Sequence, residues 1–214
     1  MKILCVGYRD WAKKIYKNLN LSKKYKLYYQ YSRLGLQKKI IKICPDIILF
    51  YGWSWKIEEK IFSSIDCFML HPSPLPKYRG GSPIQNQIIR NEKTSAVTIF
   101  KINNLIDGGD IYFQKKFSLE GNLSEIFDRI IKIGIKGTKL ILSKKKIKIK
   151  KQNNLKSTFF KRRKPHESEI TIKEIQTKSA RYIYNKIRML QDPYPNAYIK
   201  IKNKKILIKE VKIK

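Results

Sequence analysis

The chain has 214 residues, of which 42% are hydrophobic, and this length suits one α/β domain with a small appendage better than two full domains. It contains no apolar run of membrane-spanning length, and its amino terminus is predicted to be a strand and not a signal peptide, so we expect a cytoplasmic protein with no membrane contact. The formal net charge of +32 would attract phosphates, but 39 lysines against 9 arginines, scattered through every segment, fit a compositional drift at least as well as a binding face.

Strand and helix patterns alternate along the first two thirds of the chain, which is typical of a doubly wound α/β sheet. The apolar run Asp46–Tyr51, bounded by Pro45 and Gly52, favours a buried strand of a parallel sheet. The first turn lacks the second and third glycines of a dinucleotide fingerprint, so it does not predict NAD binding. The expected elements are, in chain order, strand Lys2–Gly7, helix Tyr8–Asn20, strand Lys26–Tyr31, helix Leu34–Ile43, strand Asp46–Tyr51, helix Ile57–Phe62, strand Asp66–Leu70, helix Pro83–Arg90, strand Ala96–Ile102, strand Ile111–Phe117 and helix Ser124–Leu142.

The composition of the chain changes from about Lys144, where lysines become frequent. We place the boundary of the main domain near Leu155, which gives a catalytic domain over residues 1–155 and a linker with a short subdomain over residues 156–214. The elements expected beyond Lys144 are a charged edge strand or ribbon over 144–154, a polar connector over 159–170, an amphipathic helix over Ile172–Met189, a turn over 192–198, and a hairpin of Ala197–Ile201 with Ile206–Val211 around Asn203.

The three cysteines, Cys5, Cys44 and Cys67, are widely spaced, and each lies in an apolar segment. Neither a CxxC motif nor a pair of histidines at ligand spacing occurs in the sequence. We therefore expect buried, reduced thiols, with no disulfide framework and no metal site.

The segment HPSPLPKYRGGSP, from His71 to Pro83, is the most unusual stretch of the chain. Its prolines and glycines exclude a helix or a central strand, so it is predicted to be a stiff loop leaving the end of a strand. Loops at the carboxyl edge of an α/β sheet often carry catalytic groups.

Asp107 lies downstream in IDGGD, where the glycines allow the backbone to turn sharply. A histidine with an aspartate suits acyl or one-carbon transfer to an amine, because that reaction needs a base for the amine proton and a donor for the developing oxyanion. A buried aspartate can hold an imidazole in one tautomer. Taken alone, His71 would more often be a structural histidine; its loop and Asp107 favour the catalytic interpretation.

Two tryptophans, Trp53 and Trp55, follow the strand that ends at Tyr51. Each indole N–H needs a partner, so burying both is costly. Core packing and lining a pocket for a flat heterocycle stay open as about equal alternatives.

The stretch HPSPLPKYRGGSPIQNQIIRNE, followed by TSAVTIFKINNLIDGGDIYFQKKFSL, resembles the central block of the folate-dependent formyltransferases. Loop, helix, strand and the D-x-G-D turn occur in the family's order, and a weaker similarity runs from the first strand to the end of the chain. The resemblance implies a Rossmann-like sheet, here with a small C-terminal helix and β-hairpin appendage, 10-formyltetrahydrofolate as cofactor, and formyl transfer to a primary amine.

The family works with an Asn-x-His pair and an aspartate, which the resemblance places at His71 and Asp107. Met69 stands at the position of the asparagine, and its thioether cannot donate a hydrogen bond. A backbone N–H of the loop, Gln85 or Gln114 are alternative donors. A differently tuned branch of the family and an inactive relative are two further alternatives, and we favour a working enzyme because the rest of the motif is intact.

The resemblance also implies binding residues. For the cofactor these are Trp53, Ser54, Trp55, Ile106 and Asp110. For the substrate they are the loop residues Ser73, Lys77, Tyr78, Arg79 and Gly81, with Tyr8 and Arg9 of the first turn as weaker candidates.

The C-terminal part, KRRKPHESEIT and YNKIRMLQDPYPNAYIKIKNKKILI, is similar to the link and the first portion of the terminal domain in tRNA and sugar formyltransferases. Because one hairpin cannot close a barrel, and because the DPYP turn is closer to sugar-modifying relatives, we expect a nucleotide-linked amino-dideoxy sugar as the acceptor. A truncated methionyl-tRNA formyltransferase is the enzymatic alternative, and a basic RNA-binding relative without catalysis is the second. A homodimer is left open.

Overall fold

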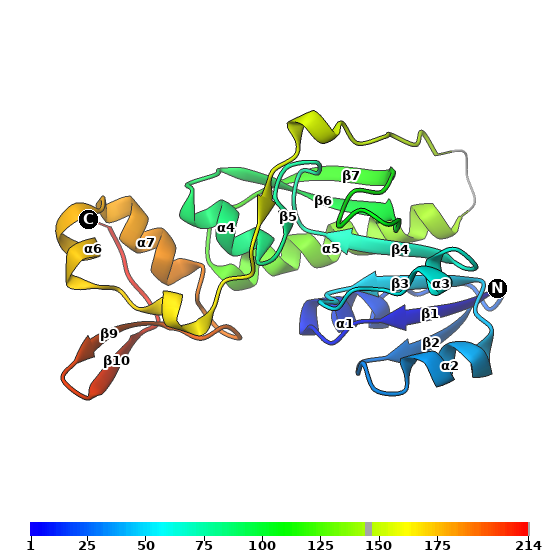
Figure 1. The fold of residues 1–214 in the computed structure, drawn as a ribbon, viewed down its shortest axis with the longest axis horizontal. Coiled ribbons are helices and arrows are strands. Elements are labelled where there is room, and N and C mark those ends of the chain that lie inside the picture. Colours follow the sequence, from blue (N-terminus) through cyan, green and yellow to red (C-terminus); the bar gives the residue numbers. More distant parts are fainter. Residues whose placement is uncertain (144–146, 214) are drawn as a thin grey trace.

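The computed structural model describes residues 1–143 and 147–213, and its centre is one six-stranded sheet in the order β2-β1-β3-β4-β6-β7 (Figure 1). The first four of these strands are mutually parallel, whereas β6 and β7 pair antiparallel. The strands are β1 (Lys2–Val6), β2 (Lys26–Gln30), β3 (Ile47–Tyr51), β4 (Asp66–His71), β6 (Thr94–Lys101) and β7 (Ile111–Ser118). The expected Rossmann-like α/β sheet is confirmed.

Helices cover both faces of the sheet, which explains why β1 and β3 are apolar at nearly every position. One face packs against α1 and α5, and the other packs against α2 and α3. The helices are α1 (Asp10–Lys17), α2 (Leu36–Ile43), α3 (Glu59–Phe62), α4 (Pro83–Ile89) and α5 (Leu123–Leu142). Within the described residues, none of the helices has the length and apolar composition needed to cross a membrane.

The alternation of side chains along β4 decides which residues accompany His71. Phe68 and Leu70 belong to the core beneath α1 and α5, whereas Cys67 and Met69 lie against the opposite core, beneath α2 and α3. Because successive side chains of a strand point to opposite faces, His71 lies on the same face as Met69. The strand therefore presents positions 69 and 71 side by side.

Tyr16 ties α1 to the two central strands. Its side chain is only 1% exposed, and its hydroxyl lies 2.8 Å from the carbonyl oxygens of both Val6 and Leu49 and accepts the N–H of Tyr51 at 2.9 Å. Burial raises the pKa of this phenol well above its usual value. The hydroxyl therefore satisfies backbone groups that water cannot reach.

Replacing Tyr16 with phenylalanine is expected to lower the free energy of unfolding by about 1–3 kcal/mol, because the buried backbone groups lose their partner. Urea denaturation followed by circular dichroism would measure the change. Tyr31→Phe, at a tyrosine that is 37% exposed, is the matched control and should have little effect. Equal stability of both variants would show that the Tyr16 hydroxyl contributes nothing.

The C-terminal region contains two helices where one was expected. They are α6 (Ile172–Thr177) and α7 (Ala180–Arg188), so the prediction of a single helix is wrong. Lys178 is extended, and the Ser179 side chain accepts the N–H of Tyr182 and caps α7. Lys186, which is 4% exposed, then joins the two helices through an ion pair with Glu174 at 2.7 Å.

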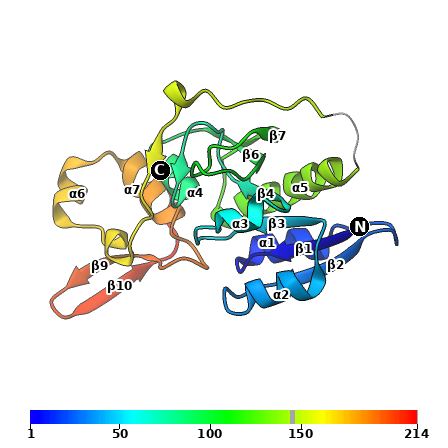
Figure 2. The same cartoon turned by 45° about the vertical axis from the view of Figure 1, so that its right-hand side comes forward.

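A hairpin of β9 (Ala197–Ile201) and β10 (Lys204–Ile208) follows, which confirms the expected terminal hairpin. Ile201 pairs with Lys204, so the turn is formed by Lys202 and Asn203 and the second strand starts earlier than predicted. The C-terminal elements lie beyond α4, away from α2 (Figures 1 and 2). Ile187 and Met189 nevertheless share the core beneath α1 and α5, and the domain boundary near Leu155 stays a prediction.

The connector, which we define as residues 147–171, runs from α5 past β5 to α6 (Figures 1 and 2). The charged ribbon expected over 144–154 lies partly outside the described residues; residues 147–154 form only an isolated bridge, between Lys150 and Ile111, so no edge strand forms there. The connector includes β8 (Phe159–Phe160), which pairs in parallel with β5 (Arg79–Gly80) of the proline-rich loop.

The cysteines depart from expectation at one position. Cys5 and Cys67 are buried free thiols, but Cys44 is exposed, so the prediction of burial is wrong there. Cys44 ends α2 in a left-handed conformation with φ of 47°. The thiol lies at the surface and donates to the Ile41 carbonyl at 3.1 Å.

Candidate active site

His71 is held at the end of β4 by the loop that follows it. The residue is 6% exposed, and its Nε2 lies 2.7 Å from the carbonyl oxygen of Tyr78. Because a carbonyl oxygen only accepts hydrogen bonds, Nε2 carries the hydrogen in this contact. Nδ1 is therefore the ring nitrogen that can take up a proton.

Asp107 reaches His71 from the loop between β6 and β7. Its Oδ2 lies 3.7 Å from His71 Nδ1 and accepts the N–H of Gly80 at 2.8 Å. The two side chains are 7% and 9% exposed, so they face each other largely away from water. The separation is too long for a hydrogen bond but allows strong attraction to a protonated ring. The imidazole is thus oriented by the Tyr78 carbonyl and not, as expected, by the carboxylate.

Tyr78 is the central residue of the proline-rich loop. Its φ of 60° places it in the left-handed region, which is uncommon for a bulky residue. The hydroxyl donates to Glu92 Oε1 at 2.6 Å and the N–H donates to Thr158 Oγ1 at 2.8 Å. Burial, together with this bond to Glu92, raises the pKa of the phenol. These contacts fix the carbonyl that holds His71.

Met69 lies on the face of His71 but offers no donor. It is partly buried and packs with Trp53 and Ile102 against the core beneath α2 and α3. Of the two alternative donors, Gln114 already donates its amide hydrogens to the Leu75 carbonyl at 3.0 Å and to Thr98 Oγ1 at 2.9 Å. Gln85 is 4% exposed, and its Nε2 has no hydrogen-bond partner among the described residues. Backbone N–H groups of the loop are the remaining alternative.

The aromatic residues expected at the cofactor site gather at the first turn. Trp53 and Trp55 lie with ring centroids 4.6 Å apart, and Tyr8 lies 5.0 Å from Trp55. The Tyr8 hydroxyl also bonds Ser54 Oγ at 2.7 Å. The guanidinium of Arg9 lies 4.8 Å from the ring centre of Tyr8 and 5.6 Å from that of Tyr194. The structure thus brings the predicted cofactor residues together with the weaker substrate candidates.

Two predicted cofactor residues do not join this aromatic group. Ile106 is 62% exposed, and the contact that Asp110 makes within the described residues is through its carbonyl, which accepts the N–H of Lys101 at 2.9 Å. The residues that fit a flat heterocycle are Trp53 and Trp55. Trp53 packs against the same apolar cluster as Met69, which lies on the face of His71. Trp55 is 39% exposed, so its ring is accessible to a ligand.

The loop residues predicted to bind substrate are mostly engaged within the protein. Ser73 is fully buried and donates to the Lys77 carbonyl at 2.9 Å, and Arg79 is 7% exposed with its guanidinium bound to Gln152 and Asn154. The polar groups of Ser73, Tyr78 and Arg79 are thus bound within the protein, and substrate contacts by these side chains stay a prediction. Lys77 is exposed and keeps that capacity.

Gly81 donates its N–H to the Phe160 carbonyl at 2.7 Å, so the connector also covers this part of the loop. A Cβ at Gly81 would lie 2.4 Å from the backbone of Arg162, so no larger residue fits there. Nothing in the sequence indicated that Gln152, Thr158 or Phe160 contribute to the site. They are distant from the motif in the chain: Gln152 lies in the predicted ribbon, Phe160 in the predicted polar connector, and Thr158 between the two.

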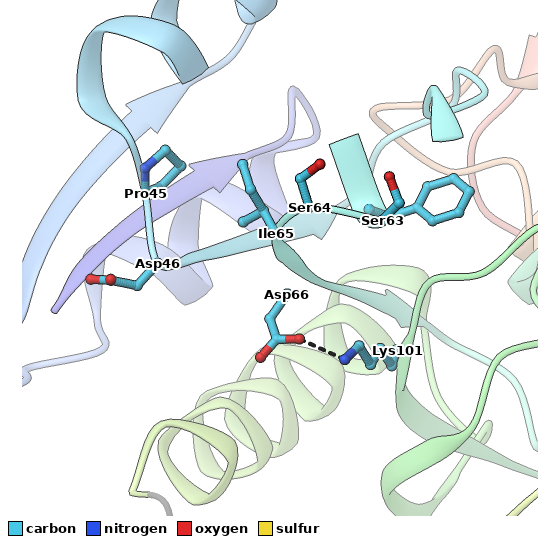
Figure 3. A pocket seen from close by; sticks show the side chains of 8 residues that line it. Pro45, Asp46, Ser63, Ser64, Ile65, Asp66 and Lys101 are labelled. Carbon is cyan, nitrogen blue, oxygen red and sulfur yellow. Dashed lines mark ion pairs between the residues drawn. The ribbon is translucent and has the colours of Figure 1, made fainter. Parts of the chain in front are cut away.

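Hollows in the surface lie elsewhere. One of about 490 Å³ is lined by polar side chains at the amino-terminal ends of β3 and β4, where Asp66 pairs with Lys101 at 2.6 Å (Figure 3). A second, of about 310 Å³, lies beside Phe68 and Tyr112. Neither includes His71 or Asp107. We locate the site at His71 and Asp107, because these two groups converge from separate parts of the chain.

Comparisons with known proteins identify the family. A family model described as formyl transferase matches residues 9–133, and one described as the methionyl-tRNA formyltransferase C-terminal domain matches residues 165–214. Methionyl-tRNA formyltransferase of Thermotoga sp. strain RQ2 is 31% identical over 151 residues, which are 67% of this chain and 47% of that protein. The chain thus spans about half the length of this curated relative.

Solved structures extend the similarity over the whole chain. Methionyl-tRNA formyltransferase from Clostridium thermocellum superposes with a TM-score of 0.89 at 33% identity, covering 100% of this chain and 94% of that one. A sugar N-formyltransferase from Shewanella sp. FDAARGOS_354 superposes with a TM-score of 0.77 at 17% identity, covering 98% and 97%. At that identity the second likeness is one of fold.

Proposed function

The chain belongs to the folate-dependent formyltransferase family, and on that premise we propose that it transfers a formyl group to a primary amine. The observation that carries the proposal is the meeting of His71 Nδ1 and Asp107 Oδ2 at 3.7 Å, between side chains that are nearly buried. Two groups from separate loops converge where a proton can be taken up and its charge balanced. A histidine held only for structure would not need a buried carboxylate opposite its free nitrogen.

The role of each residue follows from the contacts. The Tyr78 carbonyl fixes His71 Nε2, which leaves Nδ1 to accept the proton of the attacking amine. The Asp107 carboxylate then stabilises the positively charged ring, and the Gly80 N–H keeps that carboxylate in place. In this scheme His71 is the general base and Asp107 is its electrostatic partner.

The formyl donor we propose is 10-formyltetrahydrofolate, the donor used by the family. When bound, it supplies an activated formyl group. Trp53 and Trp55 would hold its flat heterocycle, since their ring centroids lie 4.6 Å apart and Trp53 packs against the same apolar cluster as Met69. Ser54, whose hydroxyl is already bonded to Tyr8, would keep the first turn against this surface.

For the acceptor we propose a nucleotide-linked amino-dideoxy sugar, supported by the DPYP turn over 192–195, which resembles that of sugar-modifying relatives. The turn places Tyr194 against Arg9 beside the aromatic group. Initiator methionyl-tRNA is the second candidate, and a specific observation favours it: the relatives at 31% and 33% identity are both described as methionyl-tRNA formyltransferases. The net charge of +32 suits either phosphate-bearing acceptor.

The proposal is tested by incubating the protein with 10-formyltetrahydrofolate and a panel of amino-sugar nucleotides and initiator methionyl-tRNA. Mass spectrometry identifies which acceptor gains a formyl group. Formylation of one acceptor establishes both the reaction and its substrate. Salt-sensitive tRNA binding without folate binding or product would instead support the non-catalytic RNA-binding alternative.

Replacing Met69 with asparagine is expected to leave kcat unchanged or to raise it, because the amide adds a donor on the face of His71. A well-placed donor of this kind is worth at most about a hundredfold to a thousandfold in rate. Met69→Leu keeps the apolar packing and serves as the control, with no change expected. Complete loss of turnover in a folded Met69→Asn protein would show that the methionine itself is required.

A further inference from the structure

The connector crosses the site at the point where the two catalytic loops meet. We propose that its segment Gln152–Phe160 is a positioning element for both catalytic side chains, in which Gln152 fixes the turn that carries Asp107 and Thr158 with Phe160 fixes the carbonyl that holds His71. The inference rests on the proposed function, because it assigns these residues a role in that same site.

Gln152 acts on the Asp107 side. Its Nε2 donates to the carbonyl oxygens of Asp107 at 2.9 Å and of Gly109 at 2.7 Å, so both amide hydrogens are used. Its Oε1 accepts from Arg79 Nη2 at 2.7 Å. Asp107 has φ of 50°, in the left-handed region that residues with a Cβ adopt less readily than glycine. A turn of that kind needs outside support, and Gln152 clamps it on either side of Gly108.

Arg79 links this clamp to the loop. Its guanidinium is nearly buried and also donates to Asn154 Oδ1 at 2.9 Å. Burial lowers the pKa of the guanidinium, and the charge of Asp107 raises it in part, so cation and carboxylate are electrostatically coupled. The positive charge is thus held close to Asp107 by two connector residues.

Thr158 and Phe160 act on the His71 side. Thr158 Oγ1 accepts the N–H of Tyr78, and its carbonyl accepts the N–H of Arg79 at 2.8 Å. The Phe160 ring stacks on that of Tyr78, with centroids 5.0 Å apart and planes 17° from parallel. The Tyr78 carbonyl, which holds His71 Nε2, is therefore fixed by the contacts that Tyr78 makes with the connector.

These contacts mean that one segment sets the distance between His71 and Asp107. Misplacing a catalytic group by about 1 Å can cost about a hundredfold in rate, while binding of substrates elsewhere is unaffected. A positioning element therefore changes kcat and leaves the affinity for the donor intact. Substitutions in a segment that only covers the loop would change neither kcat nor the affinity for the donor.

The first test is kinetic. Gln152→Ala is expected to lower kcat about tenfold to a hundredfold and to leave KM for the formyl donor within about twofold, whereas Gln176→Ala, at an exposed glutamine of α6, should leave both unchanged. Gln152→Glu keeps the acceptor for Arg79 but loses donation to the two carbonyls, so kcat should fall as it does in Gln152→Ala. Full activity in Gln152→Glu would overturn the assigned role.

The second test does not depend on turnover. The chain has two histidines, so the ring resonances of His71 can be followed by NMR with the exposed His166 as internal reference. Gln152→Ala and Thr158→Val should each shift the His71 resonances and leave those of His166 in place. Unchanged His71 resonances in both folded variants would overturn the inference. Shifted resonances in a chain that forms no product would uphold it while contradicting the proposed function.

Discussion

Replacing His71 with glutamine is expected to lower kcat for formyl transfer by about two to four powers of ten, the usual contribution of a general base. The glutamine amide can still donate to the Tyr78 carbonyl, which His71 Nε2 contacts at 2.7 Å, so the loop should keep its conformation. What is lost is the second ring nitrogen, which acts as the base in the proposed mechanism. Initial rates with saturating donor and acceptor measure the effect.

His166→Gln is the matched control for this experiment. His166 is exposed in the connector, so its replacement should leave the rate unchanged. The thermal unfolding midpoints of both variants should stay close to that of the natural chain, since glutamine can occupy either place. A rate within about threefold of the natural protein after His71→Gln would exclude a base with the usual catalytic contribution.

Replacing Asp107 with asparagine is expected to lower kcat by about a hundredfold to a thousandfold, the range seen when one preorganised electrostatic contact is removed. Asparagine tolerates the φ of 50° found here and can accept the Gly80 N–H through its carbonyl oxygen. The substitution therefore removes the charge opposite His71 Nδ1 with little change of shape. The KM values should change less than kcat, because no binding surface is altered.

Asp128→Asn, on the exposed side of α5, controls for the loss of one negative charge from a strongly basic chain. If both aspartate variants lost activity equally, the effect would come from the overall charge and not from the contact with His71. If Asp107→Asn were fully active, the carboxylate would have no part in proton transfer, and the Tyr78 carbonyl alone would account for the state of the ring.

The main sheet was predictable because the residue patterns that indicate its strands lie within short stretches of the chain. Apolar runs and their alternation indicated every strand of the central sheet. The proline-rich loop was equally clear, since proline and glycine restrict the backbone wherever they occur. The split between α6 and α7 was missed because the apolar periodicity continues across Ser179. The hydrogen bond that the Ser179 side chain accepts from the Tyr182 N–H starts a new helix at this point.

The roles of the loop side chains were less predictable. Arg79 and Ser73 have the chemistry of substrate-binding residues, and their sequence neighbours are consistent with that role. In the structure Arg79 is buried against Gln152 and Asn154, which lie far along the chain. Which polar group faces solvent depends on what covers it, and the covering segment carried no recognisable motif.

By itself the sequence determined the order of the strands along the chain, the stiffness of the loop after β4 and the identities of the imidazole and the carboxylate, because each depends on residues adjacent in the chain. Only the tertiary structure decided that His71 and Asp107 meet at 3.7 Å, and that a carbonyl and a glutamine from the connector hold them there. The physical reason is that hydrogen bonds between distant segments depend on the path of the whole chain, which no local pattern of residue types specifies.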